Sequence, residues 1–221
     1  MRAIIFDTET TGTIDPGIVQ DGWIECDHMG VTVGDLHGQL WNPGKPSGFG
    51  ALATHHITDD MVADAQPASE FALPPGVTHI IGHKVDFDWE AAGRPDVKRI
   101  CTLALARRMW PDLDSHTLGA LTYRIIGSAA REALRDAHDA RADVMLCANV
   151  LRAICAARQP TSLDDLWRMS EDARIPTHIS FGKHAGKPIS MVPSDYRSWY
   201  RRQDETDPYL LEAFKRTPAL V

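Results

Sequence analysis

The feature that most constrains this chain is a pair of carboxylates at the end of its first apolar run. Residues 3–6 (Ala-Ile-Ile-Phe) predict a buried strand, because β-branched and aromatic side chains fit a pleated sheet. The sequence continues Asp-Thr-Glu-Thr-Thr-Gly from position 7. Side chains at positions i and i+2 of a strand share a face, so Asp7 and Glu9 would lie side by side. Like charges this close repel, and a divalent cation between them is the simplest compensation; a solvated pair on a loop is the alternative interpretation.

Length and composition indicate a globular protein. The chain has 221 residues, which suffices for one sizeable α/β domain with a small appendage. No stretch approaches the roughly 20 apolar residues that cross a bilayer, and the N-terminus lacks the charged and apolar segments of a signal peptide. The four cysteines have no paired spacing, which favours buried free thiols in a reducing cytoplasm. We therefore expect a cytoplasmic protein without membrane association.

The formal net charge of −7 narrows the kinds of partner. Broad, non-specific coating of duplex DNA needs a basic face, so the charge argues against that function. It is compatible with an enzyme that holds only the end of a nucleic-acid chain. Metal ions bound to some of the acids would also offset part of the charge.

Turn signals and periodicity predict the order of the elements. Strands are expected at residues 3–6, 23–33, 38–41, 77–82 and 97–101, and helices at residues 103–110, 115–126 and 139–158. The second and third strands would be joined near Gly34-Asp35, which is a hairpin turn signal. Three strands in a meander, followed by helices that alternate with two more strands, predict an α/β fold with a mixed five-stranded sheet flanked by helices.

Two further acidic motifs follow predicted strands or open a predicted helix. Asp88 ends the pattern His-x-x-x-Phe-Asp that begins at His83, and the neighbouring Asp86 fits better as a solvated acid at a helix start. His138 and Asp143 bracket the start of the long helix. Five helical residues turn through about 500°, so the two side chains would diverge by about 140° if both were helical. His138 must therefore lie in the preceding loop if both face one site, with Asp139 as the N-cap.

The three motifs together resemble a known family. Asp-x-Glu-Thr-Thr-Gly, His-x-x-x-Phe-Asp and His-x-Ala-x-x-Asp stand in the order and spacing of the motifs of DEDDh 3′–5′ exonucleases, and the resemblance extends over nearly the whole chain. It implies a ribonuclease-H-like fold. It also implies a 3′–5′ exodeoxyribonuclease that releases 5′-mononucleotides from single-stranded or frayed DNA 3′ ends, with DNA repair as the expected process. The family usually has Asn where this chain has Lys84.

The resemblance also implies roles for individual residues. Two Mg²⁺ ions, which Mn²⁺ can replace, would lie about 3.5–4 Å apart, and four carboxylates would balance their charge. His138 would act as general base, because imidazole titrates near neutrality. Thr10 and His55 would contact the substrate. The implied metal ligands are Asp7, which would bridge the ions, Glu9, Asp88 and Asp143.

The composition changes after residue 158, which predicts a division into an exonuclease domain at 1–158 and a C-terminal extension at 159–221. The extension contains a glycine-punctuated hairpin at residues 179–187 and two short helices. The hairpin would either cover the larger domain or clamp nucleic acid. Such a clamp would be built from Lys183, His184 and Lys187, with Tyr196 or Trp199 as a stacking surface.

Two alternative functions remain open from the sequence. One is a 3′–5′ exoribonuclease that trims RNA ends, which the same motifs would serve. The other is a catalytically silent nucleic-acid-binding module of similar fold. The complete set of acids argues against the second, because inactive relatives usually lose a metal ligand.

Overall fold

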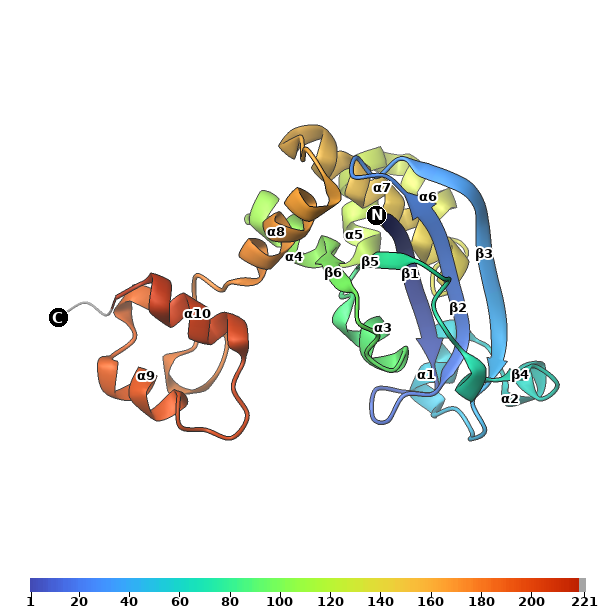
Figure 1. Cartoon of the computed structure of the whole chain (residues 1–221), viewed down its shortest axis with the longest axis horizontal. Helices are drawn as coiled ribbons and strands as arrows, with labels where there is room; N and C mark the ends of the chain where they lie inside the picture. Colours follow the sequence, from blue (N-terminus) through green and yellow to red (C-terminus); the bar gives the residue numbers. More distant parts are fainter. Residues whose placement is uncertain (219–221) are drawn as a thin grey trace. The chain divides into compact units, whose positions relative to one another are not determined.

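A mixed sheet forms the centre of residues 1–170, the larger of two compact units in this computed structural model, which describes residues 1–218 (Figure 1). The strands follow the order β4-β3-β2-β1-β5-β6 across the sheet. β1 to β3 form an antiparallel meander, and β5 and β6 run parallel to β1. The strands are β1 (Arg2–Thr10), β2 (Ile18–Cys26), β3 (Thr32–Asn42), β4 (Gln66–Pro67), β5 (Val77–Gly82) and β6 (Lys98–Cys101).

The predicted α/β architecture with a mixed sheet is confirmed, and the sheet has six strands instead of five. The additional strand, β4, has only two residues and pairs with Trp41 and Asn42 at the end of β3. A segment this short has no alternating pattern, and one of its residues is a proline, which disfavours a strand assignment.

The hairpin between β2 and β3 turns at residues 27–31, so the predicted turn at Gly34-Asp35 is wrong. The carboxylate of Asp27 accepts two backbone N–H groups of the observed turn, at 2.8 and 2.9 Å, and Gly30 supplies a positive φ of 74°. Gly34 also has a positive φ, but it lies within β3 where the register to β2 shifts. The glycine therefore marks an irregularity of the strand, which a local turn signal does not distinguish from a hairpin.

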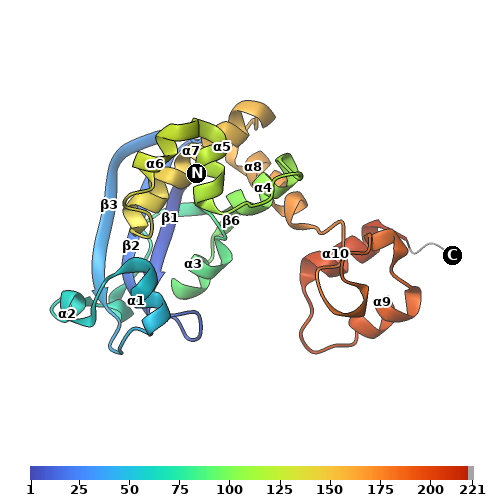
Figure 2. The same ribbon diagram turned by 180° about the vertical axis from the view of Figure 1, so that it is seen from behind.

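Helices cover both faces of the sheet. α7 (Ala140–Arg158), α5 (Leu118–Ile126) and α6 (Ala130–Ala133) lie on one side, and α3 (Asp86–Ala91) lies on the other; Figure 2 shows this arrangement from behind. Ile4 and Phe6 of β1 pack with Trp89 of α3 and with Val85 just before it. The remaining helices of this unit are α1 (Phe49–His55), α2 (Asp59–Val62), α4 (Thr102–Met109) and the start of α8 (Leu163–Arg174).

α7 comes very close to β2, and this contact positions its first turn. A Cβ atom at Gly22 would lie 2.6 Å from the backbone carbonyl carbon of Ala140, so only glycine fits there. Gln20 then ties the two elements together by donating to Asp139 and accepting from the Ala140 N–H, both at 2.9 Å. The start of α7 is thereby fixed against the centre of the sheet.

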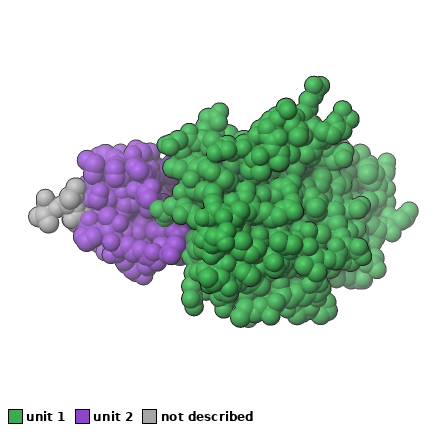
Figure 3. All heavy atoms as spheres, turned by 90° about the horizontal axis from the view of Figure 1, so that it is seen from above, with its two compact units in different colours: residues 1–170 green, residues 171–221 purple. Residues whose placement is uncertain are grey.

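Residues 171–218 form a second unit with its own small core, coloured separately in Figure 3. It contains α9 (Ser194–Tyr200) and α10 (Pro208–Arg216). The predicted hairpin is a short loop that is closed by one bridge between His178 and Pro188. Arg197 is only 4% exposed, and its guanidinium donates to backbone carbonyls, including those of Val192 at 3.0 Å and Phe214 at 3.3 Å.

The compact units divide within α8, whereas the predicted boundary lies at residue 158; that division into domains stays a prediction. All four cysteines are buried and free, as the sequence predicted. Within residues 1–218, no helix combines the length and hydrophobicity that a membrane crossing requires.

Candidate active site

The four predicted carboxylates lie around one cavity of about 230 Å³. Asp7 and Glu9 stand near the carboxyl end of β1, and Asp88 lies in the first turn of α3. Because β5 runs parallel to β1, the segment that follows β5 emerges at the same edge of the sheet and carries Asp88 there. Asp143, in the first turn of α7, completes the set.

Asp88 is held by two hydrogen bonds from one residue. The backbone N–H and the hydroxyl of Thr8 both donate to its Oδ1 atom, at 3.0 and 2.8 Å. Asp88 is 3% exposed, and this burial raises its pKa to about 7, against the lowering effect of the Thr8 hydrogen bonds and of nearby Lys84. Thr8 thus orients one oxygen of this carboxylate, and the sequence analysis did not single it out.

The pKa values of the other three acids are also raised. Burial, together with the neighbouring carboxylates, raises the pKa of Glu9 to about 8 and raises that of Asp7 well above its usual range. Burial also raises the pKa of Asp143. Acids arranged in this way hold protons near neutral pH unless a cation replaces them.

The donor set fits a hard divalent cation. Glu9, His138 and Asp143 each offer a ligand atom, and these atoms lie within 4.8 Å of one another. Carboxylate oxygens are the ligands that Mg²⁺ and Mn²⁺ prefer. The residue types of the cluster therefore suit a metal ion, and a bound cation would relieve the repulsion between its carboxylates.

His138 lies in the loop before α7, as the helical geometry predicted. It has a φ of +70°, and α7 begins at Ala140. Its backbone N–H points to Oδ1 of Asp143 at 3.4 Å. Asp139 is the N-cap and accepts the N–H groups of Arg141 and Ala142, so the predicted cap is confirmed.

A second, adjoining cavity of about 380 Å³ contains the predicted substrate residues. Thr10 and His55 line it together with Glu9, Gly12 and Phe87. Phe87 also lines the acidic cavity, and it is half-buried. α1 forms one wall of this cavity through Gly50, Ala51 and Thr54, although the prolines and glycines of residues 43–50 favour a loop there.

The ring of His55 is fixed by backbone groups on both sides. The Ile57 N–H donates to its Nδ1 atom at 2.9 Å, so Nε2 carries the proton and donates to the Thr10 carbonyl at 3.2 Å. Burial lowers the pKa of His55, which favours this neutral form. His55 therefore supports the end of β1 while its ring faces the cavity.

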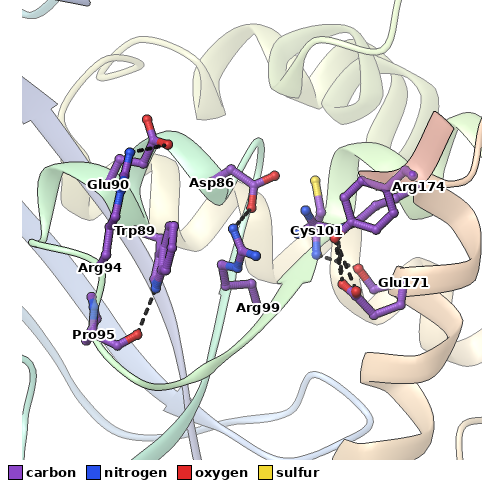
Figure 4. A network of polar contacts seen from close by, with 11 residues as sticks. Asp86, Trp89, Glu90, Arg94, Pro95, Arg99, Cys101, Glu171 and Arg174 are labelled. Atoms are coloured by element: carbon purple, nitrogen blue, oxygen red, sulfur yellow. Dashed lines mark hydrogen bonds and ion pairs between the residues drawn. The ribbon is translucent and has the colours of Figure 1, made fainter. Parts of the chain in front are cut away.

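Asp86 does not belong to the site. Its carboxylate pairs with the guanidinium of Arg99 at 2.6 Å, as Figure 4 shows, next to the hydrogen bond between Trp89 and Pro95. It is not among the residues that line the acidic cavity. Asp88, and not Asp86, therefore provides the acid of the second motif.

Comparisons with known proteins agree with this geometry, although no family model matches the chain. Exodeoxyribonuclease 10 of Escherichia coli is 28% identical over 215 residues, which cover 93% of this chain and 94% of that protein. DNA polymerase III subunit epsilon of Rickettsia prowazekii is 30% identical over 183 residues, 73% of this chain and 77% of that protein.

Solved structures show the same fold. Exonuclease X in complex with 5′ overhanging duplex DNA matches with a TM-score of 0.63 and 27% identity, over 76% of this chain and 99% of that one. Exonuclease I from Methylocaldum szegediense matches with a TM-score of 0.58 at 23% identity, which concerns the fold alone. Fold and site together define a nuclease of ribonuclease-H-like architecture. The chain belongs to the DEDDh 3′–5′ exonuclease family.

Proposed function

We propose that this protein is a 3′–5′ exodeoxyribonuclease that releases 5′-mononucleotides from single-stranded or frayed DNA ends. The observation that carries the proposal is a cavity with four buried or half-buried carboxylates beside a second cavity of about 380 Å³. DNA as the substrate is supported by the exodeoxyribonuclease and by the structure with duplex DNA to which the chain is similar. Action in DNA repair, in the cytoplasm, belongs to the same proposal.

Asp7, Glu9, Asp88 and Asp143 are the residues that would hold two Mg²⁺ or Mn²⁺ ions. Bound ions of this type lower the pKa of a water ligand and stabilise charge on phosphoryl and leaving oxygens. Thr8 keeps Asp88 in place through its two hydrogen bonds. The backbone of His138 does the same for Asp143.

His138 is the proposed general base. Its ring nitrogen lies within 4.8 Å of the carboxylates of Glu9 and Asp143, and its side chain is exposed. An exposed imidazole can take a proton from an attacking water and pass it to solvent.

The terminal nucleotide would occupy the larger cavity. Phe87 offers a ring face on which a base can stack, and Thr10 and Gly12 bring backbone groups to the same wall. The Nε2 donor of His55 keeps the Thr10 carbonyl in place. These contacts would position the terminal linkage over the acids.

The test is digestion of 5′-labelled DNA and RNA strands of the same sequence with Mg²⁺, with Mn²⁺ and with EDTA. We expect a ladder that shortens from the 3′ end, release of deoxynucleoside 5′-monophosphates, faster cleavage of DNA and no cleavage in EDTA. Faster trimming of RNA would favour the exoribonuclease instead. Binding of DNA without cleavage under all metal conditions would favour the silent binding module.

A further inference from the structure

We infer that residues 171–218 carry a second nucleic-acid contact, in which Phe181 and Trp199 stack on bases of a single strand and Lys183 and Lys187 bind its phosphates. The inference rests on the proposed function in one respect, because the strand is the DNA that the active site digests. It concerns this unit by itself.

The aromatic part is a chain of ring contacts that we name the aromatic cluster: Phe181, His184, Tyr196, Trp199 and Tyr200. Ring centroids are 5.9 Å apart between Phe181 and Tyr200, 5.2 Å between Trp199 and Tyr196, and 4.6 Å between His184 and Tyr196. Tyr196 and Tyr200 are buried in the core of the unit. The exposed rings are therefore held in place from below.

Exposure divides this cluster into anchors and free surfaces. Phe181 is 42% exposed and Trp199 is 45% exposed, whereas Tyr196 and Tyr200 are 7% and 6% exposed. The exposed part of each ring gains nothing for folding, because its apolar area stays hydrated. Rigid, exposed rings are what single-stranded nucleic acid uses for stacking, at about 1–3 kcal/mol per base.

The cationic part lies on the loop that carries Phe181. Lys183 and Lys187 are exposed, and neither has an ion pair within residues 1–218. The Lys183 ammonium lies 5.8 Å from the centre of the ring of Tyr196, the buried anchor that also contacts Trp199. Arg201 and Arg202 follow α9 directly after Trp199 and Tyr200, and both are exposed.

The loop itself is rigidly closed. The Ile179 N–H donates to the Lys187 carbonyl at 2.9 Å, and the Gly186 N–H donates to the Ile179 carbonyl at 2.7 Å. Ile179 is buried in the core of the unit, and Gly182 and Gly186 supply positive φ angles of 65° and 79°. Both lysines are thus presented from one short, anchored segment.

The charge distribution indicates why such a surface is needed. Residues 171–221 contain eight lysines and arginines against seven aspartates and glutamates, whereas residues 1–170 contain 15 against 23. The unit with the active site is therefore strongly acidic, and it repels a polyanion except where cations are bound. A slightly basic unit with unpaired lysines can supply the missing attraction. Lysine is also depleted at protein–protein interfaces, which favours nucleic acid over a protein as the occupant.

The experiment uses the full chain with Asp7→Asn, which prevents digestion, and measures binding to labelled oligothymidylates of increasing length. We expect the pair Phe181→Ala and Trp199→Ala to weaken binding of long strands about tenfold or more, since each ring contributes a stacked base. The pair Lys183→Ala and Lys187→Ala should weaken it as well, and should lower the salt slope by about 0.7 per lysine.

Matched controls separate the surface from general effects. Lys215→Ala removes the same charge from the same unit, at a residue paired with Glu212 at 3.4 Å, and Met191→Ala removes an exposed apolar side chain outside the aromatic cluster. Neither should change the binding. Trp199→Phe keeps a ring and should retain most of the affinity, and thermal unfolding of each variant shows whether a loss in Trp199→Ala comes from unfolding.

Activity of the chain with Asp7 intact separates this inference from the proposed function. The p-nitrophenyl ester of thymidine 5′-monophosphate reaches only the active site, so the ratio of kcat/KM on a long strand to kcat/KM on the ester should fall in the variants of the surface. Failure of the wild-type protein to cleave ester and DNA would overturn the proposed function but leave the binding result intact. If these variants bind DNA as tightly as the wild-type protein and the ratio is unchanged, the inference is overturned, and a protein partner becomes the alternative occupant of the surface.

Discussion

At the scale of single residues, the clustered acids of the site lower the stability of the metal-free fold. Burial, and after it the neighbouring carboxylates, raises the pKa of Asp7. We expect Asp7→Asn to reduce turnover by at least about 10²-fold, because electrostatic stabilisation of the transition state is lost. The same change should raise the melting temperature of the metal-free protein at neutral pH, because a neutral amide removes the free-energy cost of burying an ionisable carboxyl group among other acids. Thermal unfolding in EDTA checks this, and a lower melting temperature would contradict the picture of repelling acids.

His138 allows a cleaner separation of chemistry from metal binding. Its ring is exposed, and its backbone contact to Asp143 does not depend on its side chain. His138→Ala should therefore lower kcat by about 10²–10⁴-fold, as for loss of a general base, while the Mg²⁺ concentration at half-maximal rate changes little. A variant with a wild-type kcat would remove His138 from this role.

Lys84 directly follows His83, the first residue of the second motif. It is exposed on the rim of the acidic cavity, with its ammonium 5.8 Å from the centre of the Phe87 ring, and it has a φ of +73°. We expect this ammonium to contact a phosphate of the substrate, so Lys84→Asn should raise KM for DNA about tenfold with little change in kcat. Asparagine is chosen because it tolerates the left-handed backbone. Lys215→Ala is the control for charge. An unchanged KM would show that the ammonium faces solvent during binding.

At the scale of elements, the position of α7 decides whether the site exists. Alanine at Gly22 would drive its Cβ into the backbone at Ala140. We expect Gly22→Ala to destabilise the fold by about 1–3 kcal/mol and to reduce activity more than this loss of folded protein explains, since the turn with Asp143 must move. Chemical denaturation and specific activity check both parts. Gly119 lies in α5, and a Cβ there would meet only Leu134, at an ordinary contact distance of 3.7 Å. Gly119→Ala should therefore leave the stability unchanged or raise it by up to about 1 kcal/mol, and an equal loss at the two glycines would refute the argument.

The same scale shows what the sequence can and cannot predict. β1 and α7 could be predicted from their strong apolar patterns. The position of His138 before the helix that carries Asp143 could also be predicted, because a helix turns by a fixed angle per residue. The position of the turn between β2 and β3 could not be predicted, because Asp27 and Gly34 both carry local turn signals. The register of the two strands decides between them. The roles of Thr8 and Gln20 could not be predicted, because threonine and glutamine in a strand have no local sequence signal. Their partners, Asp88 and Asp139, are brought to them only by the tertiary structure.

At the scale of the whole molecule, metal binding, pH and stability are linked. Burial raises the pKa of Glu9 from 4.5 to about 8 and that of Asp88 from 3.8 to about 7, so between the lower and the higher value the metal-free folded chain holds more protons than the unfolded chain. The stability from these acids is therefore fully present below about pH 4 and is lost progressively as the pH rises to about 8. Four histidines have lowered pKa values and contribute the opposite slope at lower pH: His55, His79, His83 and His184.

Because these histidine contributions are largely common to the metal-free and metal-bound protein, the difference in melting temperature between Mg²⁺ and EDTA isolates the acids. Cations bind the deprotonated acids and release their protons, so we expect this difference to be small near pH 5 and to grow towards about pH 8. Asp7→Asn should reduce the growth, while Lys215→Ala should not. A difference that is constant with pH would mean that cations bind without displacing protons, and then the raised pKa values would not be the reason that this fold accepts a metal.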